Sequence, residues 1–317
     1  MNCLCCGKSL KEPLPASGWH PACIRRFFGT TTFPAIELTD ETLILLTDES
    51  VQRGYTVPGI QKKLPLHLSA GNSPRLTPAD YPTEYILKPQ VANFQSLPEA
   101  EHLIMQMAES AGLSVVPHAL VRLKDGYAYL TRRVDRIRTL GDGSMQMLAM
   151  EDFCQLDLRL TQDKYRGSYE RCVRVIKQYS ARPGLDLSEL FMRLVFCFLT
   201  GNSDMYLKNF SLIETAPESS NYVLSPAYDL LPVNILLPED KEEFALTMNG
   251  KKTNLHRDDF LLFAENAGIS RKAADAMIRK LLSFVSKWEA LCESSLLPPD
   301  MKQALIVLIH ARVERIT

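Results

Sequence analysis

The sequence predicts an α+β protein in which a mixed strand-and-helix part precedes a mainly helical part. A short apolar strand over residues 84–89 is followed by an amphipathic helix over residues 96–112. From Arg257 to Leu291, apolar residues recur at helical spacing. With 317 residues, the chain is long enough for one large domain or two lobes. Between these parts, further helices are expected near residues 149–156, 167–180 and 187–200.

The N-terminal segment has the cysteine and histidine spacing of a structural zinc site. Two residues lie between Cys3 and Cys6, and two lie between His20 and Cys23. In structural zinc sites, a tight knuckle and a helix start can each supply two such ligands. Four protein ligands would leave no open position for water, so the metal would be structural. Cys5 is a spare thiol that could replace a neighbouring ligand, and a set of reduced cysteines without metal is the alternative.

The next expected elements are a strand over residues 36–46 and a turn over residues 55–66. The turn carries one glycine and two lysines between apolar runs. It is a plausible flap over the phosphates of ATP, with backbone N–H groups and Lys63 as contacts. A single glycine is weak evidence, and the same residues are compatible with an ordinary hairpin turn.

In the segment over residues 84–89, the strand is expected to end on Lys88, because Pro89 would stop the ladder of hydrogen bonds. In the helix that follows, Glu101 shares one face with Ile104 and Ala108. A carboxylate on that apolar face needs a partner, so we expect an ion pair between Lys88 and Glu101. Kinases hold the α- and β-phosphates of ATP with a strand lysine that a helix glutamate positions. The alternative is a solvated lysine at the end of a strand.

A polar loop over residues 201–212 contains the residues most typical of catalysis. Four residues separate Asp204 from Asn209, and Asp229 follows twenty positions after Asn209. In protein kinases, one aspartate accepts the proton of the attacking hydroxyl, while an asparagine and a second aspartate hold Mg²⁺. The His-Arg pair that normally precedes the first aspartate is absent here. Because Asn, Asp and Ser also crowd together in ordinary turns, the loop alone leaves both interpretations open.

The composition argues against several classes of protein. The chain is 46% hydrophobic with a formal charge of −1, and no basic patch indicates nucleic-acid binding. No apolar run is long enough to span a bilayer and no signal peptide is recognisable, so a cytoplasmic protein is expected. Four of the eight cysteines are expected to be buried, reduced core residues of helices, namely Cys154, Cys172, Cys197 and Cys292.

Together, these segments resemble the HipA-like kinases, the toxins of bacterial HipA/HipB-type toxin–antitoxin systems. The matching segments occur in family order and are residues 56–63, 85–89, 130–136, 151–155, 201–211 and 227–231. The resemblance implies a bilobed protein-kinase-like fold, with a small mixed N-terminal lobe and a mainly helical C-terminal lobe. The expected organisation is a zinc-knuckle-like segment over residues 1–30, a small lobe over 31–135 and a helical lobe over 136–317.

The resemblance also implies an ATP- and Mg²⁺-dependent serine/threonine protein kinase. By position in the motifs, Asp204 is expected to be the general base, with Lys208 beside it in the catalytic set. Asn209 and Asp229 are expected to bind Mg²⁺, and residues 132–135 to form the adenine-side hinge. The expected ATP contacts are Lys63, Lys88, Glu101, Arg132, Val134, Asp135 and Tyr206.

Several positions depart from the family pattern. Tyr206 stands where a histidine is usual, and it can donate a hydrogen bond but cannot carry a positive charge. The hinge has Arg132 and Val134 where an acidic residue and an aromatic one are common, which weakens stacking on adenine. The flap usually carries serines that are autophosphorylated. Thr56 matches one of them and Pro58 replaces another, so Thr56 is the expected autophosphorylation site.

The resemblance further implies a substrate class and partners. The known targets of the family are aminoacyl-tRNA synthetases, so a synthetase is the expected substrate. Long members begin with an extra N-terminal subdomain that is missing here. The chain thus more closely resembles HipT-type toxins, in which that subdomain is a separate small protein. A HipS-like partner, a HipB-like helix-turn-helix antitoxin, or both are therefore expected, without direct binding of nucleic acid or membrane.

Two other functions remain open at this point. A catalytically silent pseudokinase would bind nucleotide and capture a partner, and Tyr206, Arg132 and Val134 favour it. The intact Asp204, Asn209 and Asp229 argue against it, since these are the residues that catalysis requires. A small-molecule kinase of the aminoglycoside or choline type would share the Asp-x₄-Asn loop, although the flap and residues 151–155 give it no support.

Overall fold

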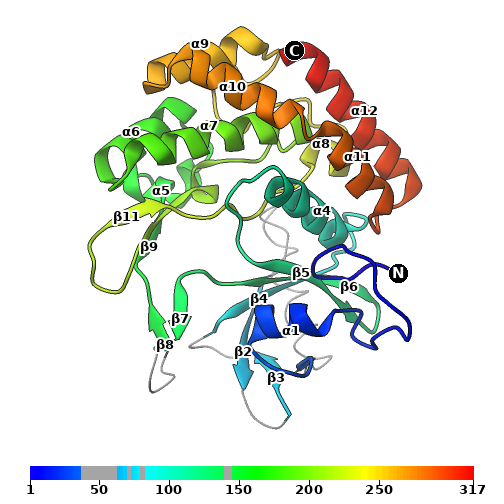
Figure 1. The fold of residues 1–317 in the computed structure, drawn as a ribbon. Coiled ribbons are helices and arrows are strands. Elements are labelled where there is room, and N and C mark those ends of the chain that lie inside the picture. Colours follow the sequence, from blue (N-terminus) through cyan, green and yellow to red (C-terminus); the bar gives the residue numbers. More distant parts are fainter. Residues whose placement is uncertain (37–62, 70–72, 79–82, 139–144) are drawn as a thin grey trace. The chain divides into compact units, whose positions relative to one another are not determined.

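The structure is a computed structural model that describes residues 1–36, 63–69, 73–78, 83–138 and 145–317 (Figure 1). Most of the predicted 36–46 strand, most of the flap and Thr56 lie outside the described residues. The chain divides into two compact units. The first comprises Met1–Leu103, Val116–Met145 and Ser294–Leu296. The second comprises Ile104–Val115, Gln146–Glu293 and Leu297–Thr317. The predicted boundaries at residues 30 and 135 stay predictions.

The first unit is built on a six-stranded sheet with strand order β1-β3-β2-β4-β6-β5. Its strands are β1 (Ala35–Ile36), β2 (Leu64–Ser69), β3 (Arg75–Pro78), β4 (Tyr85–Pro89), β5 (His118–Leu123) and β6 (Gly126–Arg132). The β1–β3 pair is parallel and the other pairs are antiparallel. Strand β4 runs one residue beyond the predicted end, since Pro89 lies opposite Ala128. Proline is tolerated at this strand end because no further ladder bond is needed.

Helix α1 (Pro21–Phe28) packs its apolar face on this sheet (Figure 1). It begins at a proline, whose missing N–H is not required at a helix start, and ends at Gly29 in the left-handed conformation. Trp19 is fully buried beside the rings of Phe27 and Phe28, each with a centroid 5.3 Å away. Its indole N–H donates to the carbonyl of Leu120 on β5 at 3.0 Å. The aromatic cluster therefore attaches the N-terminal segment to the sheet.

Helix α4 (Leu97–Ser110) confirms the amphipathic helix predicted over residues 96–112. It is buried along most of its length, and the buried residues include the polar Glu101 and His102. Its C-terminal half belongs to the second unit, where the Trp288 indole N–H donates to the Met107 carbonyl at 3.1 Å.

The second unit is mainly helical, as predicted. Its helices are α5 (Phe153–Leu156), α6 (Tyr169–Tyr179), α7 (Pro183–Thr200), α8 (Val233–Leu236), α9 (Arg257–Ala267), α10 (Arg271–Leu282), α11 (Val285–Ser294) and α12 (Pro299–Ile316). Helix α7 is buried on nearly every side and packs against α6, α9, α10 and α12. The four cysteines expected in the core are buried and free, which confirms that prediction.

A small sheet with strand order β11-β10-β9 completes this unit. Its strands are β9 (Met150–Asp152), β10 (Ser211–Glu214) and β11 (Tyr222–Leu224). Outside the two larger sheets, β7 (Arg136–Arg138) pairs with β8 (Met145–Met147). The expectation of a helix over all of residues 149–156 was wrong in its first half. Residues 150–152 pair with β10 instead, and only Phe153–Leu156 are helical.

Helix α7 ends at Gly201, which has a φ of 71° and closes the helix with its own N–H. A side chain at this position would meet Leu308 of α12 at 3.1 Å. The Gly201 carbonyl accepts from the backbone N–H of Asn234 at 3.0 Å. The start of the polar loop is therefore held by helices α8 and α12. No helix in the described part of the chain is both long and apolar enough to cross a membrane.

Candidate active site

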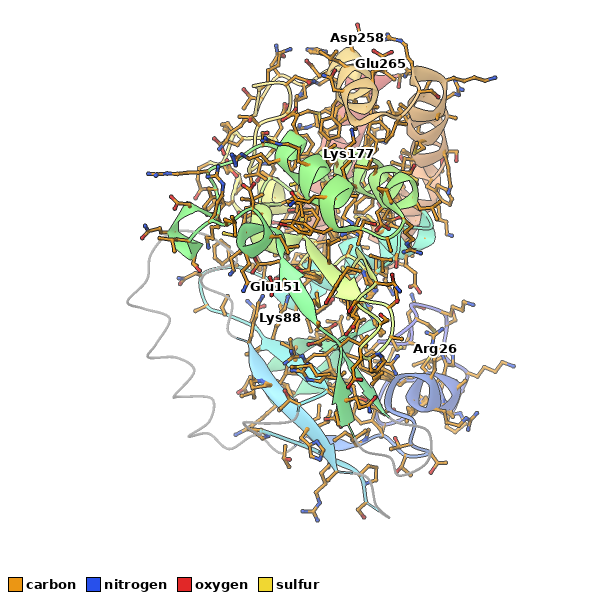
Figure 2. The ribbon with its side chains drawn as sticks, turned by 90° about the vertical axis from the view of Figure 1, so that its left-hand side faces the viewer. Arg26, Lys88, Glu151, Lys177, Asp258 and Glu265 are labelled. Carbon is orange, nitrogen blue, oxygen red and sulfur yellow. The ribbon has the colours of Figure 1, made fainter. Side chains whose placement is uncertain are left out.

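The predicted ion pair between Lys88 and Glu101 is present in the first unit. The Lys88 Nζ lies 2.5 Å from Glu101 Oε1, and the two side chains are only 2% and 0% exposed. Strand β4 carries Lys88 opposite Tyr129 of β6, and the ammonium lies 5.1 Å from the centre of that ring. Figure 2 labels Lys88 among the side chains of the sheet. The alternative of a solvated lysine is therefore excluded.

The segment predicted as the hinge follows β6 in the same unit. The Arg133 N–H donates to the Glu84 carbonyl at 2.7 Å, which continues the pairing of β4 with β6. Asp135 is buried and accepts from Arg133 at 2.8 Å and from Arg136 at 2.6 Å. Asp135 thus has a structural role in closing this turn.

Three further predicted ATP contacts belong to this unit, namely Arg132, Lys63 and Val134. The Arg132 guanidinium donates to the carbonyl of Phe27, the penultimate residue of α1, at 3.3 Å. Lys63 is exposed and directly precedes β2. Val134 is half-buried and follows Arg133 in the turn.

In the second unit, the polar loop between α7 and β10 holds Asp204 in a buried position. The Tyr165 hydroxyl donates to Asp204 Oδ1 at 2.8 Å, whereas Oδ2 is buried without a hydrogen-bond partner among the described residues. The Asn209 side-chain amide donates to the Asp204 backbone carbonyl at 2.9 Å. The backbone N–H of Asp204 donates to Asn202 Oδ1 at 3.3 Å. These bonds fix both the backbone and the carboxyl of Asp204.

Burial raises the pKa of Asp204 to about 7, compared with 3.8 for an ordinary aspartate. The hydrogen bond from Tyr165 and the charge of Lys164 lower the pKa, while Asp240 and Asp229 raise it. A carboxyl with a pKa near neutrality is suited to proton transfer, because it is available both to take up and to release a proton.

The segment that contains Asp229 is bonded to the polar loop at several points. The Tyr228 hydroxyl donates to the Lys208 carbonyl at 3.0 Å and bonds the Ser211 hydroxyl at 2.6 Å. The Ala227 N–H donates to the Ser114 carbonyl at 2.7 Å. Asp229 itself has a φ of 55°, a left-handed conformation that is uncommon for residues other than glycine. Strain of this kind is maintained by the surrounding structure and clusters at functional sites.

Tyr206 and Lys208 complete the predicted residues of this loop. Tyr206 is nearly buried, with its ring 4.8 Å from the ring of Tyr165, and burial raises its pKa well above the ordinary value for tyrosine. The Lys208 ammonium pairs with Asp152 at 3.0 Å, and Asp152 also accepts from the first turn of α5. Asp204, Asn209, Asp229, Tyr206 and Lys208 therefore belong to one bonded region of the second unit.

Sequence reasoning missed three residues of this region. Lys164 lies over the Tyr206 ring at 4.6 Å and over the Tyr165 ring at 5.1 Å. Tyr165 bonds Asp204 from 39 residues upstream, and Asp152 holds Lys208 from an equally separate segment. No local spacing connects these residues to the loop, so their contacts become evident only in the folded chain.

The predicted zinc ligands also come together, at the N-terminus of the first unit. The ligand atoms of Cys3, Cys6, His20 and Cys23 all lie within 4.8 Å of one another. Cys5 does not belong to this group.

Comparisons with known proteins agree with this architecture. Residues 55–288 match the family model of the HipA-like C-terminal domain. "Putative kinase Y4mE" of Sinorhizobium fredii is 30% identical over 239 residues, which are 73% of this chain and 55% of the relative. A "Putative kinase" of Haemophilus influenzae is 25% identical over 323 residues, covering 92% of this chain and 90% of its own length.

Two solved structures have a similar fold. HipA of Shewanella oneidensis MR-1, solved with HipB and its operator DNA, has a TM-score of 0.73 at 19% identity. The similarity covers 88% of this chain and 71% of that one. The Helicobacter pylori proinflammatory kinase CtkA has a TM-score of 0.54 at 15% identity, over 83% of this chain and 91% of its own.

The α+β architecture and its structural neighbours define a protein with a kinase-like fold, which confirms the predicted fold class. Because the family model matches most of its length, the chain belongs to the HipA-like family. It spans about half the length of the Sinorhizobium fredii relatives, 55% of "Putative kinase Y4mE" and 56% of "Putative kinase Y4dM".

Proposed function

We propose that this protein is an ATP- and Mg²⁺-dependent kinase that phosphorylates serine or threonine residues of a protein substrate. The observation that carries this proposal is the state of Asp204. Its carboxyl is buried, one oxygen is held by Tyr165, the other has no partner among the described residues, and its pKa is about 7. Such a carboxyl is poised to accept the proton of a hydroxyl group as that hydroxyl attacks a phosphoryl group.

Asn209 and Asp229 have the donor chemistry for the metal. Amide and carboxylate oxygens are the ligands that Mg²⁺ prefers, and the bond from Asn209 Nδ2 to the Asp204 carbonyl leaves Oδ1 of the amide available. When bound, Mg²⁺ would neutralise charge on the triphosphate of ATP. The Asp204 carboxylate is the proposed general base, and the Asp204 backbone carbonyl orients the Asn209 amide.

Lys88 is proposed to bind the phosphates of ATP, with Glu101 holding its ammonium in position. A buried ion pair is weak evidence for stability, because desolvation offsets much of the attraction between the charges. A role in binding an anion gives a reason for keeping this pair. Lys208, held by Asp152, is proposed to supply a positive charge in the catalytic loop.

Membership of the HipA-like family supports a further step of the proposal. The kinase would act as the toxin of a toxin–antitoxin system, with an aminoacyl-tRNA synthetase as its substrate class and Thr56 as its autophosphorylation site. A HipB-like antitoxin, a HipS-like small protein, or both would be its partners. The HipA neighbour was solved with HipB and operator DNA, which supports a HipB-like partner.

The test is mass spectrometry of the purified protein after incubation with Mg²⁺-ATP, alone and with bacterial lysate. We expect phosphate on the protein or on a lysate protein for the wild type. Asp204→Asn should abolish the transfer, as should excess EDTA. The control is Asp258→Asn, which neutralises an aspartate whose side chain is 87% exposed on α9 (Figure 2).

Two outcomes would contradict the proposal. Full transfer by Asp204→Asn would exclude Asp204 as the base. Stabilisation by ATP without transfer to any protein would identify a pseudokinase, the alternative that Tyr206 favours.

A further inference from the structure

The N-terminal cysteine and histidine group has the dimensions of a metal site. The Cys6 Sγ lies 3.4 Å and the Cys23 Sγ 4.0 Å from His20 Nδ1, and all four ligand atoms are within 4.8 Å of one another. In a tetrahedral zinc site, ligand atoms are separated by about 3.4–3.8 Å. The observed separations therefore need only a small contraction to enclose one ion.

A second hydrogen bond orients the histidine for this role. Its other ring nitrogen, Nε2, lies 3.1 Å from the Ser9 carbonyl, an acceptor, so Nε2 carries the proton and Nδ1 presents its lone pair to the cysteines. Metal-binding histidines have this arrangement, in which a backbone carbonyl fixes the tautomer. The backbone N–H of His20 also donates to Cys3 Sγ at 3.4 Å.

The turn that carries Cys3 and Cys6 is a tight knuckle. The Gly7 N–H donates to the Cys3 carbonyl at 2.9 Å, and Gly7 has a φ of 69°, which glycine adopts without strain. Cys23 lies in the first turn of α1, directly after the segment that contains His20. A knuckle and a helix start thus supply two ligands each, as in structural zinc sites.

We propose that Cys3, Cys6, His20 and Cys23 bind one structural zinc ion. Three thiolates and one imidazole suit zinc, and four protein ligands leave no position for a reacting water molecule. The proposal is independent of phosphoryl transfer, since none of the four residues belongs to the proposed catalytic set.

The bound ion would connect two parts of the segment that attach to the sheet at different points. The Leu4 carbonyl accepts from the Leu120 N–H of β5 at 2.8 Å. At the end of α1, the Phe27 carbonyl accepts from the Tyr85 hydroxyl at 3.2 Å and from Arg132 at 3.3 Å. A helix of eight residues is only marginally stable by itself. Coordination of zinc by Cys23 in its first turn would therefore stabilise α1 in its position on the sheet.

The primary test is the metal content of the protein, purified without chelator and analysed by inductively coupled plasma mass spectrometry. We expect about one zinc per chain in the wild type. Cys23→Ser removes one of the four ligands and should purify with much less zinc than the wild type. Cys5→Ser is the matched control, because Cys5 is a buried neighbouring thiol outside the group and its loss should leave the zinc content unchanged.

A second measurement does not depend on the folding of a variant. Zinc is removed from the wild-type protein with a chelator, and Co²⁺ is then added. A tetrahedral site with three thiolates should give the absorption of cobalt–thiolate charge transfer, and adding zinc should abolish it and restore the melting temperature. Arg25→Ala, at an exposed position of α1, should behave as the wild type.

Three results would overturn the proposal. One is wild-type protein that neither contains zinc nor takes up zinc or Co²⁺. Another is full zinc content in Cys23→Ser. The third is loss of zinc in Cys5→Ser but not in Cys23→Ser, which would exclude the proposed set of ligands.

Discussion

Removing one partner of the Lys88–Glu101 pair should destabilise the protein more than removing both. Both side chains are almost completely buried and their charged atoms are 2.5 Å apart, so a single substitution removes the ion-pair partner of a buried charge. Breaking a buried pair in this way costs about 3–5 kcal/mol, whereas replacing both charges by apolar groups of similar volume is often neutral or stabilising. We therefore expect Lys88→Met and Glu101→Leu each to lower the free energy of unfolding by about 3–5 kcal/mol.

The double variant should recover most of this loss and lie within about 2 kcal/mol of the wild type. Urea unfolding followed by circular dichroism would measure all four proteins of the cycle. The double variant should nevertheless fail to bind ATP, because it has no ammonium for the phosphates. The double variant would thus be nearly as stable as the wild type and yet unable to bind nucleotide.

The control is the ion pair between Arg271 and Asp258, whose side chains are 56% and 87% exposed. Breaking an exposed pair should cost less than about 1 kcal/mol. The reasoning would be refuted if single substitutions of Lys88 and Glu101 cost as little as this control. It would also be refuted if the losses of the two single variants simply added in the double variant.

Two further predictions concern the polar loop. In EDTA and without nucleotide, the raised pKa of Asp204 means that the folded protein keeps a proton that the unfolded chain loses. The free energy of unfolding should therefore fall as the pH rises from about 4 to about 7. At pH 8, urea unfolding should show Asp204→Asn to be more stable than the wild type, by up to about 4 kcal/mol. The same pH dependence in both proteins would contradict the assignment. Tyr165→Phe removes a hydrogen bond that lowers the pKa of Asp204, so the acidic limb of kinase activity should move to higher pH by about one pH unit, while Tyr179→Phe should not move it. An unchanged limb in Tyr165→Phe would show that this bond does not tune the base.

The features that the sequence predicted well depend on short-range spacing. The Lys88–Glu101 pair followed from a strand that ends on a lysine and a helix face that turns a carboxylate inward. The four proposed zinc ligands, which the structure brings together, likewise occur as two local pairs in the sequence. By contrast, Lys164 and Tyr165 reach Asp204 and Tyr206 from a distant loop, and no periodicity marks such contacts.

The strand β9 illustrates the same limit for secondary structure. Residues 150–152 fall within the helix that the sequence predicts near residues 149–156, whereas only residues 153–156 are helical. The extended conformation of residues 150–152 depends on pairing with β10, which lies about sixty residues later in the chain. Tertiary pairing of this kind overrides local propensity, so a single short segment gives no warning of it.

The contact between Gly201 and Leu308 has a consequence for the time at which activity can arise during synthesis. Gly201 starts the loop that carries Asp204, and it is packed by α12, whose residues are translated about one hundred positions later. A nascent chain that already contains every proposed catalytic residue therefore still lacks the helix that holds the loop. Under the proposed function, the ribosome would therefore have to translate α12 before the protein could act as a kinase.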